Sequence, residues 1–456
     1  ADTTEPRYAE IARLMLTTND WITPWFEPDV PFWGKPPLSF WAQALSFKLF
    51  GINEFAGRLP ALLAFIATAW MLWRMAVSAV SAHVAAASVV VYSSMLLTFL
   101  AAGTVMTDPY LALGTTWAMV AFYLAPKENV WYWRYGVFIG LGIGLLAKGP
   151  LAIVIAGAPI GLWVLFQGKL MHYLRTMPWI RGTLLTLLIA LPWYILAELK
   201  TPGFINYFIV GEHFMRFVDP GWMGDLYGHA HKEAKGMIWL HWLAGSTPWG
   251  PLALLLLVGH MLTASLRKTV WHALKQPVVI YALLWALVTP VFFTAAGNVI
   301  WTYVLPSMPA FALLMGWAMV KLNNGQKWRK LGFIFVMWFM PIAGLIFSAF
   351  IANNNNLMKT EKTIAEYVAQ QPQIGDNSNW SRLYYLAPKL EFSARFYSHD
   401  KAKPVKMGQL ENLVMQQQGV FLAVPTDQWE TTVAHFGARL EPRIENMRFK
   451  LAFLKP

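Results

Sequence analysis

Long apolar stretches, separated by short polar connections, limit what this chain can form. A helix needs about twenty apolar residues to cross the hydrocarbon core of a bilayer. Charged residues make up 13% of the chain, whereas soluble domains carry roughly 25%. The sequence therefore predicts an α-helical polytopic membrane protein with ten candidate spans, at 58–77, 83–102, 109–125, 131–147, 150–166, 182–198, 238–263, 277–296, 302–320 and 331–351.

Basic residues fall at alternate connections between these stretches. They lie near 74, 127–134, 169–181, 267–275 and 321–330, and Lys148 is the only one in the intervening short connections. Cytoplasmic loops carry an excess of Lys and Arg, so the first set is predicted to be cytoplasmic.

The same rule predicts the domain organisation. Residues 1–57 would form an external loop, 58–351 a transmembrane domain with an external connection at 199–237, and 352–456 an external domain. Because the chain would then begin outside the cytoplasm without an apolar span to export it, we expect a further span to precede residue 1.

Several functional classes are disfavoured by composition. The net charge of +12 is scattered between apolar spans, which does not suggest nucleic-acid binding, and the absence of Cys excludes disulfides and thiolate chemistry. Ion-coupled carriers usually keep carboxylates inside the membrane, whereas nearly all carboxylates here lie in predicted external segments. We therefore expect the chemistry to take place at the outer surface.

The first external loop has an amphipathic segment at each end. Residues 5–18 and 38–50 place apolar side chains along one face, and both segments are too short and too polar to span. They are predicted to be helices lying in the membrane surface. Five prolines and many aromatic residues lie between them, which is typical of an irregular segment at headgroup level.

The C-terminal region, 353–456, has a different pattern. Residues 419–425 and 447–454 alternate like strands, whereas 362–371 and 426–436 have helical periodicity. The sequence therefore predicts a small α/β domain here.

Several short motifs, taken in order, resemble bacterial GT-C glycosyltransferases, most of all the lipid A aminoarabinose transferases and the wider protein O-mannosyltransferase-like family. They are "DTTEPRYAEIA", "DWITP", "GKPPLSFW", "LFGINEFAGRLPALL", "GTVMTDPYLAL", "GLLAKGP", "PWY", "GEHFMRF" and "WTYVLPSMPAFALL", and they cover residues 1 to about 320. The part from 353 resembles the small periplasmic α/β domain that many of these enzymes carry.

The resemblance implies an inverting transferase in the bacterial inner membrane, acting as a monomer at its periplasmic face. Its donor would be a sugar on undecaprenyl phosphate, and its acceptor lipid A or another envelope glycolipid. A protein O-glycosyltransferase of the same fold is the alternative acceptor class. Two alternative hypotheses come from other functional classes: the chain could be a polyprenol-lipid flippase or transporter, or a structural scaffold.

Such a transfer needs a carboxylate to accept the proton of the acceptor hydroxyl. The family places its essential acid just before the "RY" pair, and "DTTEPRY" offers both Asp2 and Glu5. Asp2 is our first candidate for the base and Glu5 the second. Asp108 in "TDP" is predicted to be an orienting or electrostatic partner, although Asp before Pro also suits a helix start.

Cations must stabilise the phosphate as it leaves. The resemblance points to Arg7, Lys35 and Lys148 as phosphate ligands, although the two lysines would also suit snorkelling at the interface. Arg216 and His213 of "GEHFMRF" are expected to close over the donor, and Tyr303 to hydrogen-bond its phosphate.

Two departures from the family concern the ligands. A Lys often precedes the tyrosine of "TYVLP", whereas this chain reads "GNVIWTY". The Glu that usually precedes the lysine of "KPP" is replaced by Gly34, although Glu27, Asp29 or His213 offer substitute ligands. Because a metal site needs several converging ligands, we predict no obligatory metal and no other cofactor beyond the lipid-linked donor.

Overall fold

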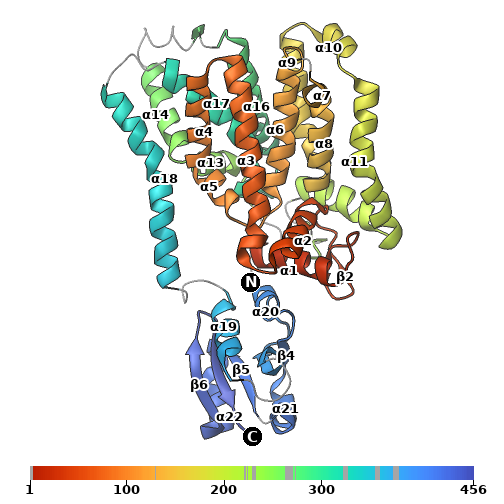
Figure 1. Cartoon of the computed structure of the whole chain (residues 1–456), viewed down its shortest axis with the longest axis vertical. Coiled ribbons are helices and arrows are strands. Elements are labelled where there is room, and N and C mark those ends of the chain that lie inside the picture. The colour runs from red at the N-terminus through yellow and green to blue at the C-terminus, as the bar shows by residue number, and fades with distance from the viewer. Residues whose placement is uncertain are drawn as a thin grey trace. The chain divides into compact units, whose positions relative to one another are not determined.

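The protein is described by a computed structural model that covers residues 4–128, 130–219, 222, 224–227, 233–261, 271–272, 274–321, 327–354, 360–372, 379–417 and 419–456. The chain divides into two compact units (Figure 1). The larger unit is residues 14–342, and the smaller combines 1–13 with 343–456.

The larger unit is a bundle of helices, and each of the ten predicted ranges coincides with a helix or a pair of helices. Its elements from residue 54 are α3 (Glu54–Ala79), α4 (Ala82–Ser94), α5 (Leu96–Ala102), α6 (Asp108–Leu124), α7 (Trp131–Arg134), α8 (Gly136–Lys148), α9 (Leu151–Phe166), α10 (Leu170–Thr176), α11 (Trp179–Lys200), η1 (Asn206–Met215), α12 (Arg216–Val218), α13 (Met237–Gly245), α14 (Trp249–Met261), α16 (Pro277–Phe293), η2 (Trp301–Ser307) and α17 (Met308–Lys321). Helix α18 (Lys327–Asn353) runs from this unit into the smaller one.

Membrane-spanning character is clear for part of the bundle. Among the described residues, three helices are long and apolar enough to cross a membrane, at Glu54–Ala79, Trp179–Lys200 and Trp301–Lys321. Two bent pairs, α4 with α5 at 74° and α13 with α14 at 106°, raise the number to five if each pair is one span. The chain is thus a helical membrane protein, and the count of ten spans stays a prediction.

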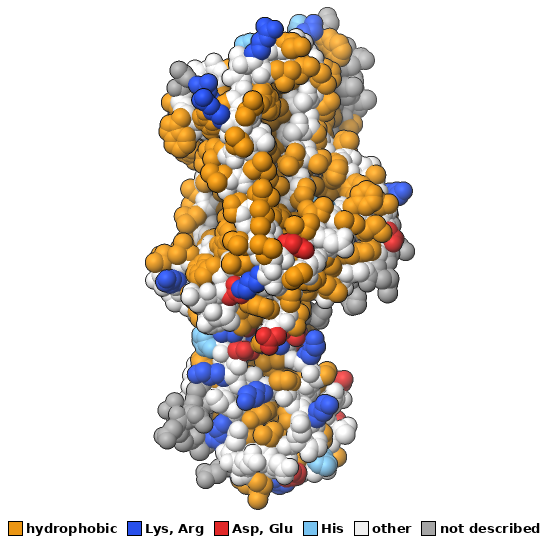
Figure 2. Space-filling view, turned by 90° about the vertical axis from the view of Figure 1, so that its right-hand side faces the viewer, with side chains coloured by type: hydrophobic (Ala, Val, Ile, Leu, Met, Phe, Trp, Pro, Cys, Tyr) orange, Lys and Arg blue, Asp and Glu red, His pale blue; other side chains and the backbone are white. Residues whose placement is uncertain are grey.

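The outer surface of the bundle suits a lipid environment. On α11, the side chains of Leu184 and Leu188 are 60% and 72% exposed. Figure 2 shows that hydrophobic side chains form much of this face of the bundle. Such an apolar surface is costly in water and is expected against lipid tails.

Helices α6 and α8 are packed unusually closely, because small residues face each other. A Cβ atom added to Gly114 would lie 2.6 Å from the carbonyl oxygen of Gly140 and 2.8 Å from the backbone nitrogen of Gly144. Glycine is common where membrane helices approach backbone to backbone. Since the two helices run in opposite directions, the first residue of α6, Asp108, lies beside the last residue of α8, Lys148.

The first loop contains two helices joined by a small hairpin. Helix α1 (Thr4–Thr17) and helix α2 (Leu38–Phe50) confirm the two helices predicted here. Between them, β1 (Trp25–Glu27) pairs antiparallel with β2 (Val30–Pro31), a hairpin that the sequence reasoning missed. The turn uses Asp29 at φ 63°, a conformation that Asp tolerates better than most residues.

The smaller unit contains an α/β fold, as predicted. Its sheet has the strand order β4–β3–β5–β7–β6, in which β3 pairs parallel with β4 and β5, and β7 pairs antiparallel with β5 and β6. The strands are β3 (Leu383–Leu386), β4 (Lys403–Val405), β5 (Val420–Pro425), β6 (Leu440–Glu445) and β7 (Phe449–Leu454), and the α-helices are α19 (Lys362–Gln370), α20 (Phe392–Tyr397), α21 (Leu410–Gln417) and α22 (Trp429–Phe436).

Candidate functional site

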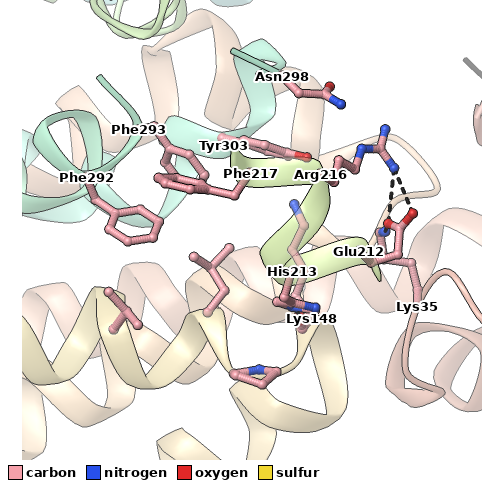
Figure 3. Close-up of a pocket in the computed structure, with 13 residues that line it drawn as sticks. Lys35, Lys148, Glu212, His213, Arg216, Phe217, Phe292, Phe293, Asn298 and Tyr303 are labelled. Carbon is pink, nitrogen blue, oxygen red and sulfur yellow. Dashed lines mark hydrogen bonds and ion pairs between the residues drawn. The ribbon is translucent and has the colours of Figure 1, made fainter. Parts of the chain in front are cut away.

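Five of the predicted site residues line one cavity in the larger unit. The cavity measures about 180 Å³, and Figure 3 shows side chains from several elements converging on it. Its lining residues are Lys35, Lys148, Pro150, Leu151, Val154, Glu212, His213, Arg216, Phe217, Phe292, Phe293, Asn298 and Tyr303. One part of the wall is therefore charged and another is aromatic and aliphatic.

Asp108, the sixth predicted residue, reaches this cavity through Lys148. The Nζ of Lys148 lies 2.5 Å from Oδ1 of Asp108, and both side chains are less than a tenth exposed. The same Nζ lies 4.4 Å from the centre of the Tyr303 ring, a cation–π distance.

The contacts of Asp108, Lys148 and Lys35 bear on the alternative interpretations of these three residues. Asp108 is the first residue of α6, and its carboxylate forms an ion pair with the ammonium group of Lys148. Lys148 is 6% exposed, so its charge is held inside the protein and does not snorkel to the interface. The side chain of Lys35 is 20% exposed and is paired with Glu212, which also differs from a snorkelling lysine.

An unusual helix supplies another part of the cavity wall. Residues Asn206–Met215 form a π-helix, η1, which continues directly into the short helix α12. π-Helices are rare in proteins, and those that occur are often found at functional sites. Here η1 carries Glu212 and His213, and α12 begins with Arg216.

Glu212 joins two cations of the cavity. Its Oε2 lies 3.3 Å from Nζ of Lys35, and its Oε1 lies 3.0 Å from Nη1 of Arg216. Burial opposes the charge of Glu212, but Lys35 and Arg216 outweigh it and hold the pKa of the carboxyl below its usual range. Burial likewise opposes the charge of Arg216, and the carboxylate of Glu212 raises the pKa of that guanidinium.

His213 ties η1 to the end of α8. Its Nδ1 lies 2.8 Å from the carbonyl oxygen of Phe208, and its Nε2 lies 3.0 Å from the carbonyl oxygen of Lys148. Burial lowers the pKa of His213, and these two carbonyl contacts offset only part of that effect. The neutral ring is therefore favoured, and it donates to one of the two carbonyls at a time.

Tyr227 fixes the segment that carries Lys35. The backbone N–H of Trp33 donates to the Tyr227 hydroxyl at 2.9 Å, and that hydroxyl donates to the carbonyl oxygen of Pro31 at 2.7 Å. The indole N–H of Trp33 also donates to the Thr201 hydroxyl at 3.1 Å. The first loop is thus hydrogen-bonded to the connection that follows α11, which brings Lys35 to Glu212.

The other predicted residues belong to the start of the chain. Asp2 falls outside the described residues. Glu5 and Arg7 lie in the first turn of α1, within the smaller unit, and the Arg7 guanidinium lies 5.3 Å from the centre of the Tyr8 ring. In the described part of the chain, three or more His, Asp or Glu side chains nowhere gather as a metal site would require, and the prediction on metals stays a prediction.

Sequence reasoning missed two polar residues of the cavity, Glu212 and Asn298. Glu212 stands directly before the singled-out His213 and four residues before Arg216, so the spacing that pairs charges on a helix was a usable signal. Asn298 lies in "GNVIWTY", the stretch that departs from the family, and its buried side chain lines the cavity.

The arrangement suits a phosphate attached to an apolar group. Lys35, Lys148 and Arg216 supply positive charge at one side, and the Nε of Arg216 is a buried donor without a hydrogen-bond partner among the described residues. Phe217, Phe292 and Phe293 line another part of the wall. Guanidinium and ammonium groups bind phosphate oxygens through charge-assisted hydrogen bonds.

Comparisons with known proteins find relatives of the chain in sequence and in fold. Residues 1–208 match the family described as dolichyl-phosphate-mannose-protein mannosyltransferase. The chain is 30% identical over 344 residues to the undecaprenyl phosphate-alpha-4-amino-4-deoxy-L-arabinose arabinosyl transferase of Yersinia pestis, covering 72% of this chain and 56% of that protein. The enzyme of the same name from Aeromonas hydrophila is 31% identical over 358 residues, which cover 75% of this chain and 60% of that one.

The chain thus spans less than two thirds of the length of these relatives. Its fold is similar to the crystal structure of ArnT from Cupriavidus metallidurans bound to undecaprenyl phosphate, with a TM-score of 0.71 at 17% identity over 99% of this chain and 93% of that one. The structure of the same protein in the apo state gives a TM-score of 0.69. In sequence the chain is thus similar to these arabinosyl transferases and, over residues 1–208, to the mannosyltransferase family, and its fold is that of the ArnT structure.

Proposed function

We propose that the chain is an inverting membrane glycosyltransferase that moves a sugar from undecaprenyl phosphate to lipid A or another envelope glycolipid. The observation that carries this proposal is the cavity in which Lys35, Lys148 and Arg216 face a wall of phenylalanines. The names of the relatives, and the lipid bound in the structure of similar fold, support the same donor.

In this reaction the cations bind the carrier phosphate and stabilise it as it leaves. The acceptor oxygen attacks the anomeric carbon, the bond from that carbon to the phosphate oxygen breaks, and the acceptor proton passes to a carboxylate. Asp108 orients Lys148 through their ion pair, and Tyr303 lies against the same ammonium. Charged groups held in a water-poor site stabilise developing negative charge far better than they would in water.

The base is assigned to the acid pair at the start of the chain, with Asp2 first and Glu5 second. Asp2→Asn keeps the shape of the side chain but lowers its basicity, so turnover should fall roughly 10²–10⁴-fold, while donor binding is retained. Glu5→Gln is the matched variant, and if it is the more damaged of the two, Glu5 is the base. Normal transfer by both variants would remove this assignment.

The cavity is assigned to the periplasmic side of the inner membrane. Figure 1 shows α2, beside the segment that carries Lys35, at the opposite end of the bundle from α7 and α10. Basic residues lie at the α7 and α10 end, among them Arg134 and Arg175. Because cytoplasmic ends are rich in Lys and Arg, the cavity end, the first loop and the domain from 352 are proposed to face the periplasm.

A transfer assay tests the proposal. The protein in detergent is incubated with undecaprenyl phosphate-linked aminoarabinose and lipid A, and the products are analysed by mass spectrometry. Modified lipid A supports a transferase. A protein that moves the carrier lipid across sealed vesicles, but makes no glycosidic product in detergent, would be a flippase.

A further inference from the structure

Among the described residues, the cations that line the cavity are already paired with carboxylates of the protein. Three cations, Lys35, Lys148 and Arg216, stand in ion pairs with three carboxylates, Asp108, Glu212 and Asp225. With His213 favoured in its neutral form, these paired groups sum to a formal charge of zero. A phosphate that binds here therefore has to compete with carboxylates that the protein already holds.

Glu212 is the carboxylate best placed for this competition. It contacts both Lys35 and Arg216, it lines the cavity, and its side chain is only 5% exposed. Figure 3 shows that Arg216 and Lys35 approach the Glu212 carboxylate from two different elements. Asp108 differs, because its ion pair is with Lys148.

We propose that Glu212 is an internal counter-ion that occupies Lys35 and Arg216 while the cavity is empty and yields both to the carrier phosphate. Glu212 is thus a positioning residue, which acts through the two cations. Without a carboxylate between them, two buried cations would repel each other and each would be desolvated without compensation.

The same carboxylate has a consequence for product release. Transfer converts the phosphodiester of the donor, with one negative charge, into a phosphomonoester that carries up to two. On charge alone, the product lipid therefore binds the cations more strongly than the donor does, which would slow its departure. An anion of the protein that competes for the cations counters this effect. Glu212 is that competitor, and its return to Lys35 and Arg216 favours departure of the spent carrier.

The inference predicts an unusual direction of effect. It rests on the proposed function, because the phosphate is that of the lipid carrier. Glu212→Gln removes the competing charge but keeps an oxygen for hydrogen bonding, so undecaprenyl phosphate should bind about tenfold more tightly. A role limited to holding the structure together predicts the opposite, since loosened cations would bind phosphate less well.

The experiment measures binding of undecaprenyl phosphate to the full-length protein in detergent, and its inhibition of sugar transfer. Glu212→Gln should lower both the dissociation constant and the inhibition constant about tenfold, while Glu212→Asp, which keeps the charge, should stay close to the wild type. Glu198→Gln is the matched control. The Glu198 carboxylate accepts hydrogen bonds from the backbone N–H groups of Gly203 and Ile205. The affinity of the Glu198→Gln protein for undecaprenyl phosphate should equal that of the wild type.

A second variant protects the test if Glu212→Gln does not fold. Asp225 lies 3.5 Å from Arg216, and its Oδ1, which Asn retains, accepts the backbone N–H of Tyr227. Asp225→Asn should tighten binding by a smaller factor.

The outcomes separate the two ideas. Unchanged or weaker binding by the folded variants would overturn the counter-ion and leave the proposed function standing. A wild-type protein that does not bind undecaprenyl phosphate would overturn both.

Discussion

Asp108 and Lys148 form a buried ion pair across two closely packed helices of the bundle, α6 and α8. Nζ of Lys148 lies 2.5 Å from Oδ1 of Asp108, although forty residues separate them in the sequence. The pair meets because antiparallel α6 and α8 approach backbone to backbone at Gly114 and Gly140. Packing between small residues in the middle of the bundle thus positions a charge at the edge of the cavity.

The pair can be tested by removing first one partner and then both. Asp108→Asn leaves a buried ammonium without its carboxylate, which should lower the free energy of unfolding by about 3–5 kcal/mol and reduce transfer. Asp108→Asn combined with Lys148→Met removes both charges and should recover most of the stability. Because Lys148 is proposed to bind phosphate, transfer should stay low in the double variant. Recovery of transfer together with stability would show that the pair is purely structural.

The close approach of α6 and α8 gives a second prediction. Gly114→Leu places a Cβ atom 2.6 Å from the carbonyl oxygen of Gly140, so the helices must separate. We expect a loss of stability of about 1–3 kcal/mol, seen as a lower unfolding temperature in detergent, together with a loss of transfer. Gly157→Leu on α9 is the control, since a Cβ there meets nothing within 4 Å. Equal unfolding temperatures for the two variants would contradict this packing.

His213 should make the stability of the protein depend on pH. Burial lowers its pKa below the usual value, which is about 6.5 in an unfolded chain. The unfolded state therefore binds the proton first as pH falls, so the stabilisation present above about pH 6.5 should be lost below it.

The measurement is the unfolding temperature between pH 8 and pH 5. His213→Gln cannot titrate, and its curve should be flatter than that of the wild type over this range. His172→Gln, which changes an exposed histidine on α10, should keep the wild-type slope. A wild-type slope in His213→Gln would show that this ring does not carry the pH dependence.

Much of the bundle was predictable, because apolar length and basic connections are local properties of the sequence. The ranges around α3, α6, α9 and α16 were located this way. The bends between α4 and α5 and between α13 and α14 were not, since each range reads as one apolar stretch. The hairpin of β1 and β2 was also missed, because its short strands lie among prolines that suggest irregular backbone.

Part of the cavity lining was located from sequence motifs, and the pairing of its charges was not. The motifs singled out Lys35, Lys148, His213, Arg216 and Tyr303, all of which line one cavity. The role of Glu212 depends on η1 and on the segment that Tyr227 fixes, two features that arise only from tertiary packing. The ion pair of Lys35 and Glu212 joins residues 177 positions apart, so local spacing gives no indication of it.

The central claim is that this cavity takes the phosphate of the carrier lipid, and native mass spectrometry of undecaprenyl phosphate binding tests it most directly. Arg216→Gln removes one charge-assisted donor, and binding should weaken about 10- to 100-fold. Lys200→Gln is the control, because Lys200 pairs with Asp20 at 2.6 Å and does not line the cavity. The account predicts full binding by the wild type and by Lys200→Gln, with a clear loss in Arg216→Gln. Equal binding by all three proteins would contradict it.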